Sequence, residues 1–169
     1  MSESMRSLAP MLVVFAGLMG LMYLGFDRVL AHRNNPNLQV ATGVDAPTRV
    51  VLKRSPAGRY LAPGTINGEP VTFLIDTGAD HVAVPARIAE RAGLTRRSST
   101  LVNTAGGVVK AYDTQIERMR LGGIQLNYIE GSINPSMTGD YVLLGMSFLR
   151  HVDFSKRGDE LIIEPPATY

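Results

Sequence analysis

The sequence predicts an all-β domain with one or two short helices, preceded by an apolar N-terminal helix. Three observations favour this fold class. Runs of β-branched and aromatic residues, typical of strands, recur from residue 58 onward. Glycine-bearing turn signals separate these runs at short intervals, as they do in closed barrels and sandwiches. The stretch from Leu8 to Phe26 carries no charged residue and stands apart from the rest.

The apolar stretch predicts a transmembrane helix, which needs about 20 apolar residues. A cleaved signal peptide has a shorter apolar region of about 7–15 residues, and here Arg28 precedes the candidate cleavage site at 29–31. We therefore favour an uncleaved anchor within residues 1–31 over a signal peptide. Arg6 on one flank nearly balances Arg28 and Arg33 on the other, so charge alone does not fix the orientation.

Residues 32–57 are predicted to form a linker between this anchor and a folded domain at 58–169. The segment contains several prolines and asparagines and shows little sustained periodicity, which is typical of irregular chain. A short strand at 50–52 is predicted within it.

The folded domain is predicted to be a series of hairpins with two short helical segments. Asn67-Gly68 is a strong two-residue turn signal, because both positions can take positive φ. Pro85 and Gly93 suit the first turn and the C-terminal end of a helix. The predicted strands are 60–66, 71–75, a hairpin within 101–112 that turns at 105–107, 116–121, 124–133, 141–144, 152–155 and 160–164, and the predicted helical segments are 85–93 and 147–151.

Composition argues against several classes of function. The chain has no cysteine, so it has no disulfide, no thiolate nucleophile and no cysteine-based metal site. Its histidines, His32, His81 and His151, lack the spacing of metal ligands. The net charge is only +2 and no long run of Lys or Arg occurs. We therefore expect no metal, no cofactor and no nucleic-acid partner.

Asp76 is the strongest candidate for a catalytic residue. It ends an apolar strand and opens the triplet Asp76-Thr77-Gly78. A carboxylate in such surroundings is costly unless it is hydrogen-bonded or has a chemical task. Gly78 lets the chain turn and bring backbone N–H groups toward the carboxylate. A structural aspartate in a tight turn is the simpler interpretation, but Ala79-Asp80 and a second apolar run after the triplet favour catalysis.

This segment resembles the active-site strand and loop of retropepsin-like aspartic proteases, the retroviral protease group. The Asn67-Gly68 hairpin leads into the triplet, and a second glycine-bearing hairpin at 103–108 follows where this family carries its flap. Residues 142–145 resemble the family's hydrophobic-hydrophobic-Gly strand, and 146–149 resemble a bacterial, membrane-anchored branch. The resemblance covers 58–164 and implies a closed β-barrel half of the acid protease fold.

The resemblance also implies a role for each matching residue. Asp76 would be the catalytic carboxylate, and Thr77 and Gly78 would support its loop, Thr77 through a hydrogen bond across a dimer axis. Leu144 and Gly145 would pack behind the loop. The residues that would contact substrate belong to the loop and the flap: Ala79, Asp80, Asn103, Thr104, Ala105, Gly106 and Gly107.

The chemistry of this class predicts a homodimer. Acid proteolysis uses two carboxylates that share one proton, because like charges about 3 Å apart cannot both ionise. The chain offers one suitable triplet, since Asp113-Thr114-Gln115 lacks the glycine and a two-lobed monomer would need a much longer chain. We therefore expect Asp76 of a second copy, related by a two-fold axis, to complete the site.

Some positions depart from the family pattern. Retroviral members usually carry an arginine directly after the hydrophobic-hydrophobic-Gly element, where it pairs with the acid of the active-site loop. Met146 occupies that place, so Asp80 lacks its usual partner and Arg150 is the candidate replacement. His81 is either a residue that tunes a substrate pocket or an exposed turn residue. The strand at 160–164 is a candidate for the dimer interface.

We therefore expect a membrane-anchored, homodimeric aspartic endopeptidase that hydrolyses peptide or protein substrates with a water activated by paired Asp76 carboxylates. The alternative is a non-catalytic retropepsin-like module that binds peptides or proteins, and a β-rich scaffold factor unrelated to proteases is a third hypothesis. The resemblance implies a single-pass protein of the bacterial inner membrane. The short N-terminal stub favours a periplasmic domain.

Overall fold

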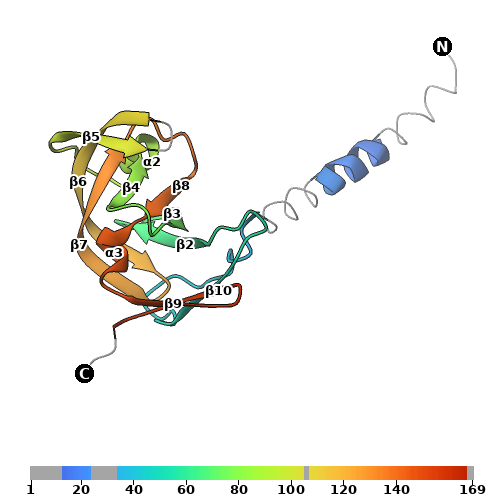
Figure 1. Ribbon diagram of the computed structural model, residues 1–169. Coiled ribbons are helices and arrows are strands. Elements are labelled where there is room, and N and C mark those ends of the chain that lie inside the picture. Colours follow the sequence, from blue (N-terminus) through green and yellow to red (C-terminus); the bar gives the residue numbers. More distant parts are fainter. Residues whose placement is uncertain (1–12, 24–33, 105–106, 167–169) are drawn as a thin grey trace, which may run out of the picture. The chain divides into compact units, whose positions relative to one another are not determined.

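The computed structural model describes residues 13–23, 34–104 and 107–166. The chain divides into two compact units, Met1–Asn34 and Asn35–Tyr169. The second unit carries all of the strands among the described residues (Figure 1). It therefore contains the predicted β domain.

The first unit contains a helix over residues 13–23. Its apolar side chains are exposed, and Val13 and Leu21 are 72% and 71% accessible. The rest of the predicted anchor at 8–26 lies outside the described residues. Among the helices that the structure describes, none is both long and apolar enough to cross a membrane.

The second unit is mostly β, as predicted, and its two short helices follow strands. Helix α2 comes directly after β4, and α3 after β8. The strands are β1 (Val50–Lys53), β2 (Leu61–Ile66), β3 (Glu69–Ile75), β4 (Val82–Pro85), β5 (Ser99–Thr104), β6 (Gly107–Leu121), β7 (Ile124–Asn134), β8 (Tyr141–Leu144), β9 (Asp153–Arg157) and β10 (Glu160–Glu164), and the helices are α2 (Ala86–Arg91) and α3 (Met146–Leu149).

Six of these strands close into a barrel. They follow the order β2-β3-β8-β4-β7-β6, and β2 pairs with β6 to complete the ring. Strand β6 is long enough to pair with β5 through its first part and with β2 through its last residues. Large side chains such as Phe73, Ile116 and Leu144 are fully buried between the strands. The closed all-β fold with short helices is confirmed.

The hairpin between β2 and β3 forms as its turn residues predict. Asn67 and Gly68 have φ angles of 51° and 92°, which are the positive values that a two-residue hairpin of this kind requires. The Asn67 Oδ1 also accepts a hydrogen bond from the Arg118 N–H at 3.0 Å. The turn therefore fixes the register of β3, the strand that leads into Asp76.

Strand β6 runs unbroken where two strands were predicted, the first within 101–112 and the second at 116–121. The intervening polar residues stay in the ladder, because Asp113 pairs with Ser132 and Gln115 with Glu130 of β7. The prediction of two separate strands was therefore wrong, because β6 is one strand. A barrel wall that faces a cavity on one side accepts polar residues without ending the strand.

The segment predicted to be a linker packs on the barrel from residue 35 onward. Asn37 is buried. Its Nδ2 donates to the carbonyls of Lys53 and Leu61 at 2.9 and 2.8 Å, and its Oδ1 accepts the Lys53 N–H at 2.7 Å. Side-chain hydrogen bonds of this kind satisfy irregular backbone in place of a regular ladder. The structure thus differs from the predicted boundary at residue 58.

Strand β10 lies in the middle of a three-stranded sheet of order β1-β10-β9. Both of its hydrogen-bonding edges are therefore occupied, by β1 on one side and β9 on the other. The strand at 160–164 therefore has no free edge for pairing with a second copy, and its place in a dimer interface stays a prediction. The outer edges of this sheet belong to β1 and β9.

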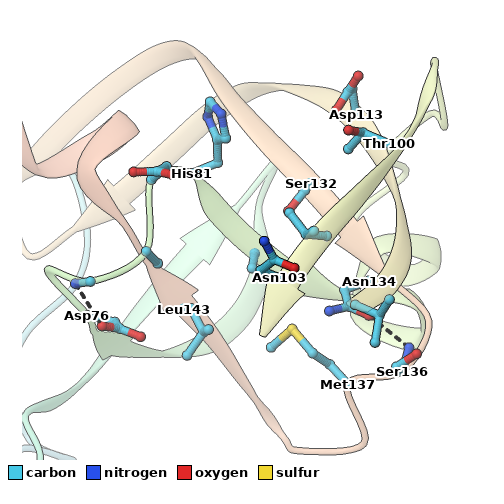
Figure 2. Close-up of a pocket in the computed structure, with 16 residues that line it drawn as sticks. Asp76, His81, Thr100, Asn103, Asp113, Ser132, Asn134, Ser136, Met137 and Leu143 are labelled. Atoms are coloured by element: carbon cyan, nitrogen blue, oxygen red, sulfur yellow. Dashed lines mark hydrogen bonds between the residues drawn. The ribbon is translucent and has the colours of Figure 1, made fainter. Parts of the chain in front are cut away.

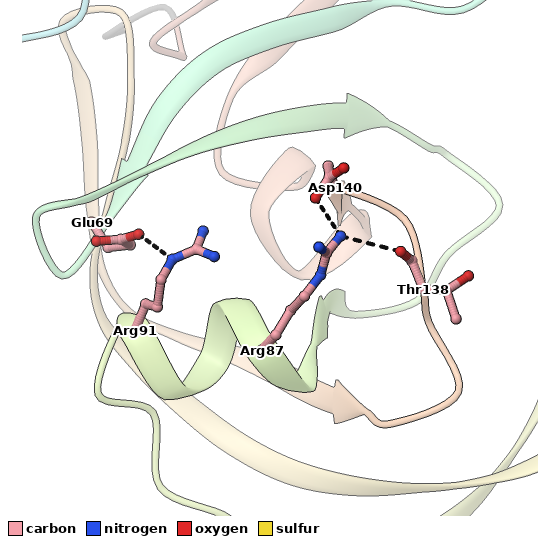
Figure 3. A network of polar contacts seen from close by, with 5 residues as sticks. All are labelled: Glu69, Arg87, Arg91, Thr138 and Asp140. Atoms are coloured by element: carbon pink, nitrogen blue, oxygen red, sulfur yellow. Dashed lines mark hydrogen bonds and ion pairs between the residues drawn. The ribbon is translucent and has the colours of Figure 1, made fainter.

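Exposed ion pairs attach α2 to the strands around it (Figure 3). The Arg91 Nε lies 2.6 Å from the Glu69 Oε1. Arg87 pairs with Asp140 and donates to the Thr138 carbonyl at 3.1 Å. Exposed pairs add about 1 kcal/mol or less to stability, but Arg91 ties α2 to the first residue of β3, and Arg87 ties it to the loop that precedes β8. That loop forms one wall of the cavity described below.

Candidate active site

The loop after β3 holds the side chain of Asp76 in place. The Asp76 N–H donates to the Leu144 carbonyl at 3.2 Å. The Asp76 Oδ1 accepts the Gly78 N–H at 3.0 Å, and a Cβ on Gly78 would lie 3.3 Å from that oxygen. A glycine at position 78 therefore lets the backbone donor approach the carboxylate closely.

Gly145 packs directly beneath this loop. A Cβ at position 145 would lie 2.3 Å from the His81 carbonyl oxygen and 2.6 Å from that of Ala79. Both contacts are with backbone, so no rotation of a side chain could relieve them. Only glycine allows the loop to approach β8 this closely. Leu144, the preceding residue, is fully buried.

The start of α3 binds the far half of the loop. The Met146 N–H donates to the Ala79 carbonyl at 2.8 Å, and the Ser147 N–H donates to the Asp80 carbonyl at 2.9 Å. The Ser147 Oγ accepts the Val82 N–H at 3.0 Å and donates to the Glu130 carbonyl at 2.7 Å. Ser147 therefore joins the loop, β4 and β7. The sequence indicates this role of Ser147 only weakly, because the residue stands out merely as a small polar side chain within an apolar run.

The proposed pairing of Arg150 with Asp80 is wrong. The Arg150 Nη2 lies 3.7 Å from the Glu130 Oε2 instead. The Asp80 side chain is exposed and has no hydrogen bond or ion pair with the described residues. Backbone hydrogen bonds and Ser147 hold the loop without the usual ion pair, and the Asp80 carboxylate is left facing the cavity.

A cavity of about 860 Å³ opens beside the loop (Figure 2). Asp76, Gly78, Ala79 and Asp80 line it, and so does Asn103 from β5. The structure thus brings these residues of the predicted loop and flap together around one space. Among the described residues, no group of three or more His, Cys, Asp or Glu is placed to hold a metal ion.

The other predicted site residues lie differently. Thr77 is exposed and is not among the described residues that line the cavity. Thr104 pairs with Gly107 at the end of the β5–β6 hairpin, and Gly107 does not line the cavity either. Ala105, Gly106 and the side chain of Thr104 lie outside the described residues.

The floor of the cavity includes residues that no sequence motif indicates as site residues. Strand pairing aligns Leu143 with Ala83, Ala83 with Ser132, and Ser132 with Asp113 in one row across four strands. All four line the cavity. His81, for which the sequence allows either a pocket residue or an exposed turn residue, lines the cavity too. Alternation along β6 and β7 could have placed 113 and 132 on inward faces, but the sequence does not reveal their alignment.

A closed six-stranded barrel whose Asp-Thr-Gly loop opens on a cavity is characteristic of retropepsin-like aspartic proteases. The family model described as "gag-polyprotein putative aspartyl protease" matches residues 62–151, more than half of the chain. The chain belongs to this family. The predicted resemblance is thereby confirmed for the protease domain, while the membrane-anchored branch stays a prediction.

Individual proteins are also similar to this chain. The chain is 28% identical over 169 residues to an uncharacterized protein from the cobV 5' region of a Sinorhizobium species, covering 94% of this chain and 72% of that protein. It is 26% identical to the crystal structure of a retropepsin-like aspartic protease from Rickettsia conorii, with a TM-score of 0.56, covering 68% of this chain and 97% of that one. The inhibitor-bound EIAV protease has 22% identity and a TM-score of 0.45, covering 54% and 86%.

Replacing Ser147 should loosen the loop without touching Asp76. Ser147→Ala leaves the buried Val82 N–H and Glu130 carbonyl without their partner, so we expect a loss of about 1–3 kcal/mol in the free energy of unfolding. Urea unfolding measures this loss, and amide exchange at Val82 should become faster. Ser155→Ala, at an exposed position of β9, is the matched control. Equal urea midpoints and equal Val82 protection in the two variants would contradict the anchoring role.

Proposed function

We propose that this protein is a homodimeric aspartic endopeptidase in which each copy contributes Asp76 to one active site. The observation that carries the proposal is the Asp76 carboxylate, which accepts the Gly78 N–H and lines a cavity large enough for several peptide residues. Family membership supports the reaction class. The exposed Thr77 beside it is suited to a contact with a second copy.

The proposed reaction is general acid–base hydrolysis. One Asp76 carboxylate takes a proton from a water molecule, and the resulting hydroxide attacks the scissile carbonyl carbon. The other Asp76, protonated, donates a hydrogen bond to the carbonyl oxygen as negative charge develops there. The tetrahedral intermediate then collapses as the Asp76 that took up the proton of water passes it to the amide nitrogen, which leaves as the amine. Two like charges close together share one proton, which keeps one acid and one base in the same site.

The proposed substrate is a peptide or protein segment in extended conformation. Both the loop of Asp76 and the β5–β6 hairpin contribute to the cavity, since Asn103 and Val109 of the hairpin line it together with Asp76. A hairpin over a cavity can close on the substrate and exclude water. Backbone hydrogen bonds then give affinity, and pockets for the side chains give specificity.

We further propose that the N-terminal segment anchors the enzyme in the bacterial inner membrane with the protease domain in the periplasm. The charge-free stretch at 8–26 supports this proposal, as do the exposed apolar side chains of residues 13–23. Confinement to one membrane raises the effective concentration of a weakly associating pair. Anchoring would therefore favour the dimer.

Asp76→Asn should abolish cleavage while leaving the fold intact. The substitution removes the base and the acid but keeps the shape of the side chain, so we expect kcat/KM to fall by at least about 100-fold. Cleavage of a mixed peptide library by the full chain, followed by mass spectrometry between about pH 4 and 7, measures this. Asp159→Asn, whose side chain is 85% exposed in the turn between β9 and β10, is the control. Undiminished cleavage by Asp76→Asn would refute the assignment, and binding without cleavage by the wild type would favour the binding module.

Mixing the two proteins tests the shared site. If subunits exchange, a ninefold excess of Asp76→Asn chains captures most wild-type chains in mixed pairs, and activity per wild-type chain falls to about one-tenth. The same excess of a variant carrying both Asp76→Asn and an unrelated charge change on the surface serves as a replicate. Activity that depends only on the amount of wild-type protein would show that one chain is sufficient.

A reporter fused to the C-terminus tests the proposed location. We expect alkaline phosphatase, which needs an oxidising compartment, to be active in the fusion in a bacterial host. A fluorescent or β-galactosidase reporter in the same position should be inactive. The reverse pattern, with only the cytoplasmic reporter active, would place the domain on the other side of the membrane.

A further inference from the structure

We propose that the far end of the cavity binds a basic side chain of the substrate, Lys or Arg, and that Asp113 determines this specificity. The proposal rests on the proposed function, since it names the substrate class of the same site. It starts from the row of residues that crosses the cavity floor. Leu143 and Ala83 form the apolar end of the row near Asp76, and Ser132 and Asp113 form the polar end (Figure 2).

The polar end contains donors and acceptors that nothing in the described protein satisfies. Asp113 is partly buried, and its carboxylate has no hydrogen bond or ion pair with the described residues. Ser132 is only 8% exposed and Asn134 only 6%. The Ser132 hydroxyl and the Asn134 Nδ2 likewise lack partners in this part of the chain, although the Asn134 Oδ1 accepts the Ser136 N–H at 2.9 Å. These atoms are open to the cavity, since the buried side-chain atoms without a partner among the described residues belong to Asn35 and Tyr60, so a polar ligand that enters the cavity can pair with them.

The charge of the cavity points to a cation. Three carboxylates line it, those of Asp76, Asp80 and Asp113, and no Lys or Arg does so among the described residues. A cationic side chain would place N–H donors against the Asp113 carboxylate and the Ser132 oxygen. An acidic side chain would meet like charge there, and an apolar one would displace water from these polar groups without pairing with them.

The protein's own cations near Asp113 bind elsewhere. The Arg97 Nη2 donates to the Gln115 Oε1 at 3.2 Å. The Arg96 guanidinium and the Lys110 ammonium lie over the ring of Tyr112, 5.0 and 5.6 Å from its centroid. Tyr112 directly precedes Asp113 in β6, and adjacent strand residues point to opposite faces. Arg96 and Lys110 therefore lie on the other face of the strand, and Arg97 is held by Gln115, so the Asp113 carboxylate is available to a substrate.

The row also indicates which substrate residue reaches Asp113. Neighbouring strands are about 4.8 Å apart, so the three steps from Leu143 to Asp113 cover about 14 Å. An extended peptide advances about 3.3 Å per residue, and a lysine side chain reaches about 6 Å. The basic residue should therefore lie two or more positions from the scissile bond, while the apolar end of the row accommodates side chains beside it.

Peptide libraries with one fixed position test the proposal. In each library of ten-residue peptides one position is Lys, Arg, norleucine or Glu and the others are randomised. Binding is measured to full-length Asp76→Asn protein, which does not consume the peptides, and cleavage is measured with the wild type. We expect at least about a tenfold preference for Lys or Arg over Glu at one position. Asp113→Asn should remove the preference, and Asp113→Lys should reverse it toward Glu.

Glu117→Gln is the matched control, because Glu117 lies on the same strand but is exposed and outside the cavity. It should keep the preference. Cleavage that depends on Asp76 but shows no charge preference, or the same preference in Asp113→Asn, would overturn this inference and leave the proposed function standing. A binding preference that depends on Asp113, with no cleavage by the wild type, would support the inference and reject the proposed function. No binding of any library would overturn the inference.

Discussion

The close approach of the Asp76 loop to β8 is the contact on which the rest of the site depends. Strand β8 pairs in parallel with β3, which enters the loop, and pairs with β4, which leaves it, at Ala83 and Leu143. The loop therefore crosses over the end of β8, and Gly145 makes room for it by lacking a side chain. Any large movement of Asp76 would break pairing on both sides of β8. The fold thus positions the carboxylate through backbone contacts, which are hard to deform.

This arrangement suits chemistry with protonated acids. An arginine–aspartate pair beneath the loop would weaken when the carboxylate takes up a proton. The bonds that replace it, from Met146 and Ser147 to the loop carbonyls, involve no group that titrates. The Ser147 hydroxyl extends the same anchoring to Val82 and Glu130. The loop is therefore held without the Asp80 carboxylate, and the Asp80 side chain is available to the cavity.

Local features of the fold could be predicted from the sequence, and long-range ones could not. The Asn67-Gly68 turn and β8 depend on a few neighbouring residues, and both form where expected. The packing of Asn37 on the barrel depends on carbonyls of Lys53 and Leu61, which no local pattern reveals. The alignment of Ala83 with Ser132 likewise comes from a parallel pairing of segments far apart in the chain. That Ser132 and Asp113 line the same cavity therefore follows from the folded barrel and could not be predicted from the sequence.

The two-fold symmetry of the proposed dimer would determine how the apolar and polar ends of the cavity contact a substrate. A single chain supplies one Asp76 and one row that changes from apolar at Leu143 to polar at Asp113. In a two-fold dimer the same row recurs on the opposite side of the paired carboxylates. A peptide has direction and could not match both halves equally, but in the proposed dimer it would meet a polar end at a similar distance on each side of its scissile bond. The dimer would thus have one acidic subsite on each side of the scissile bond, with apolar subsites between them. A substrate with a basic residue on both sides of the bond would pair with more of the cavity's polar groups than a substrate with a single basic residue.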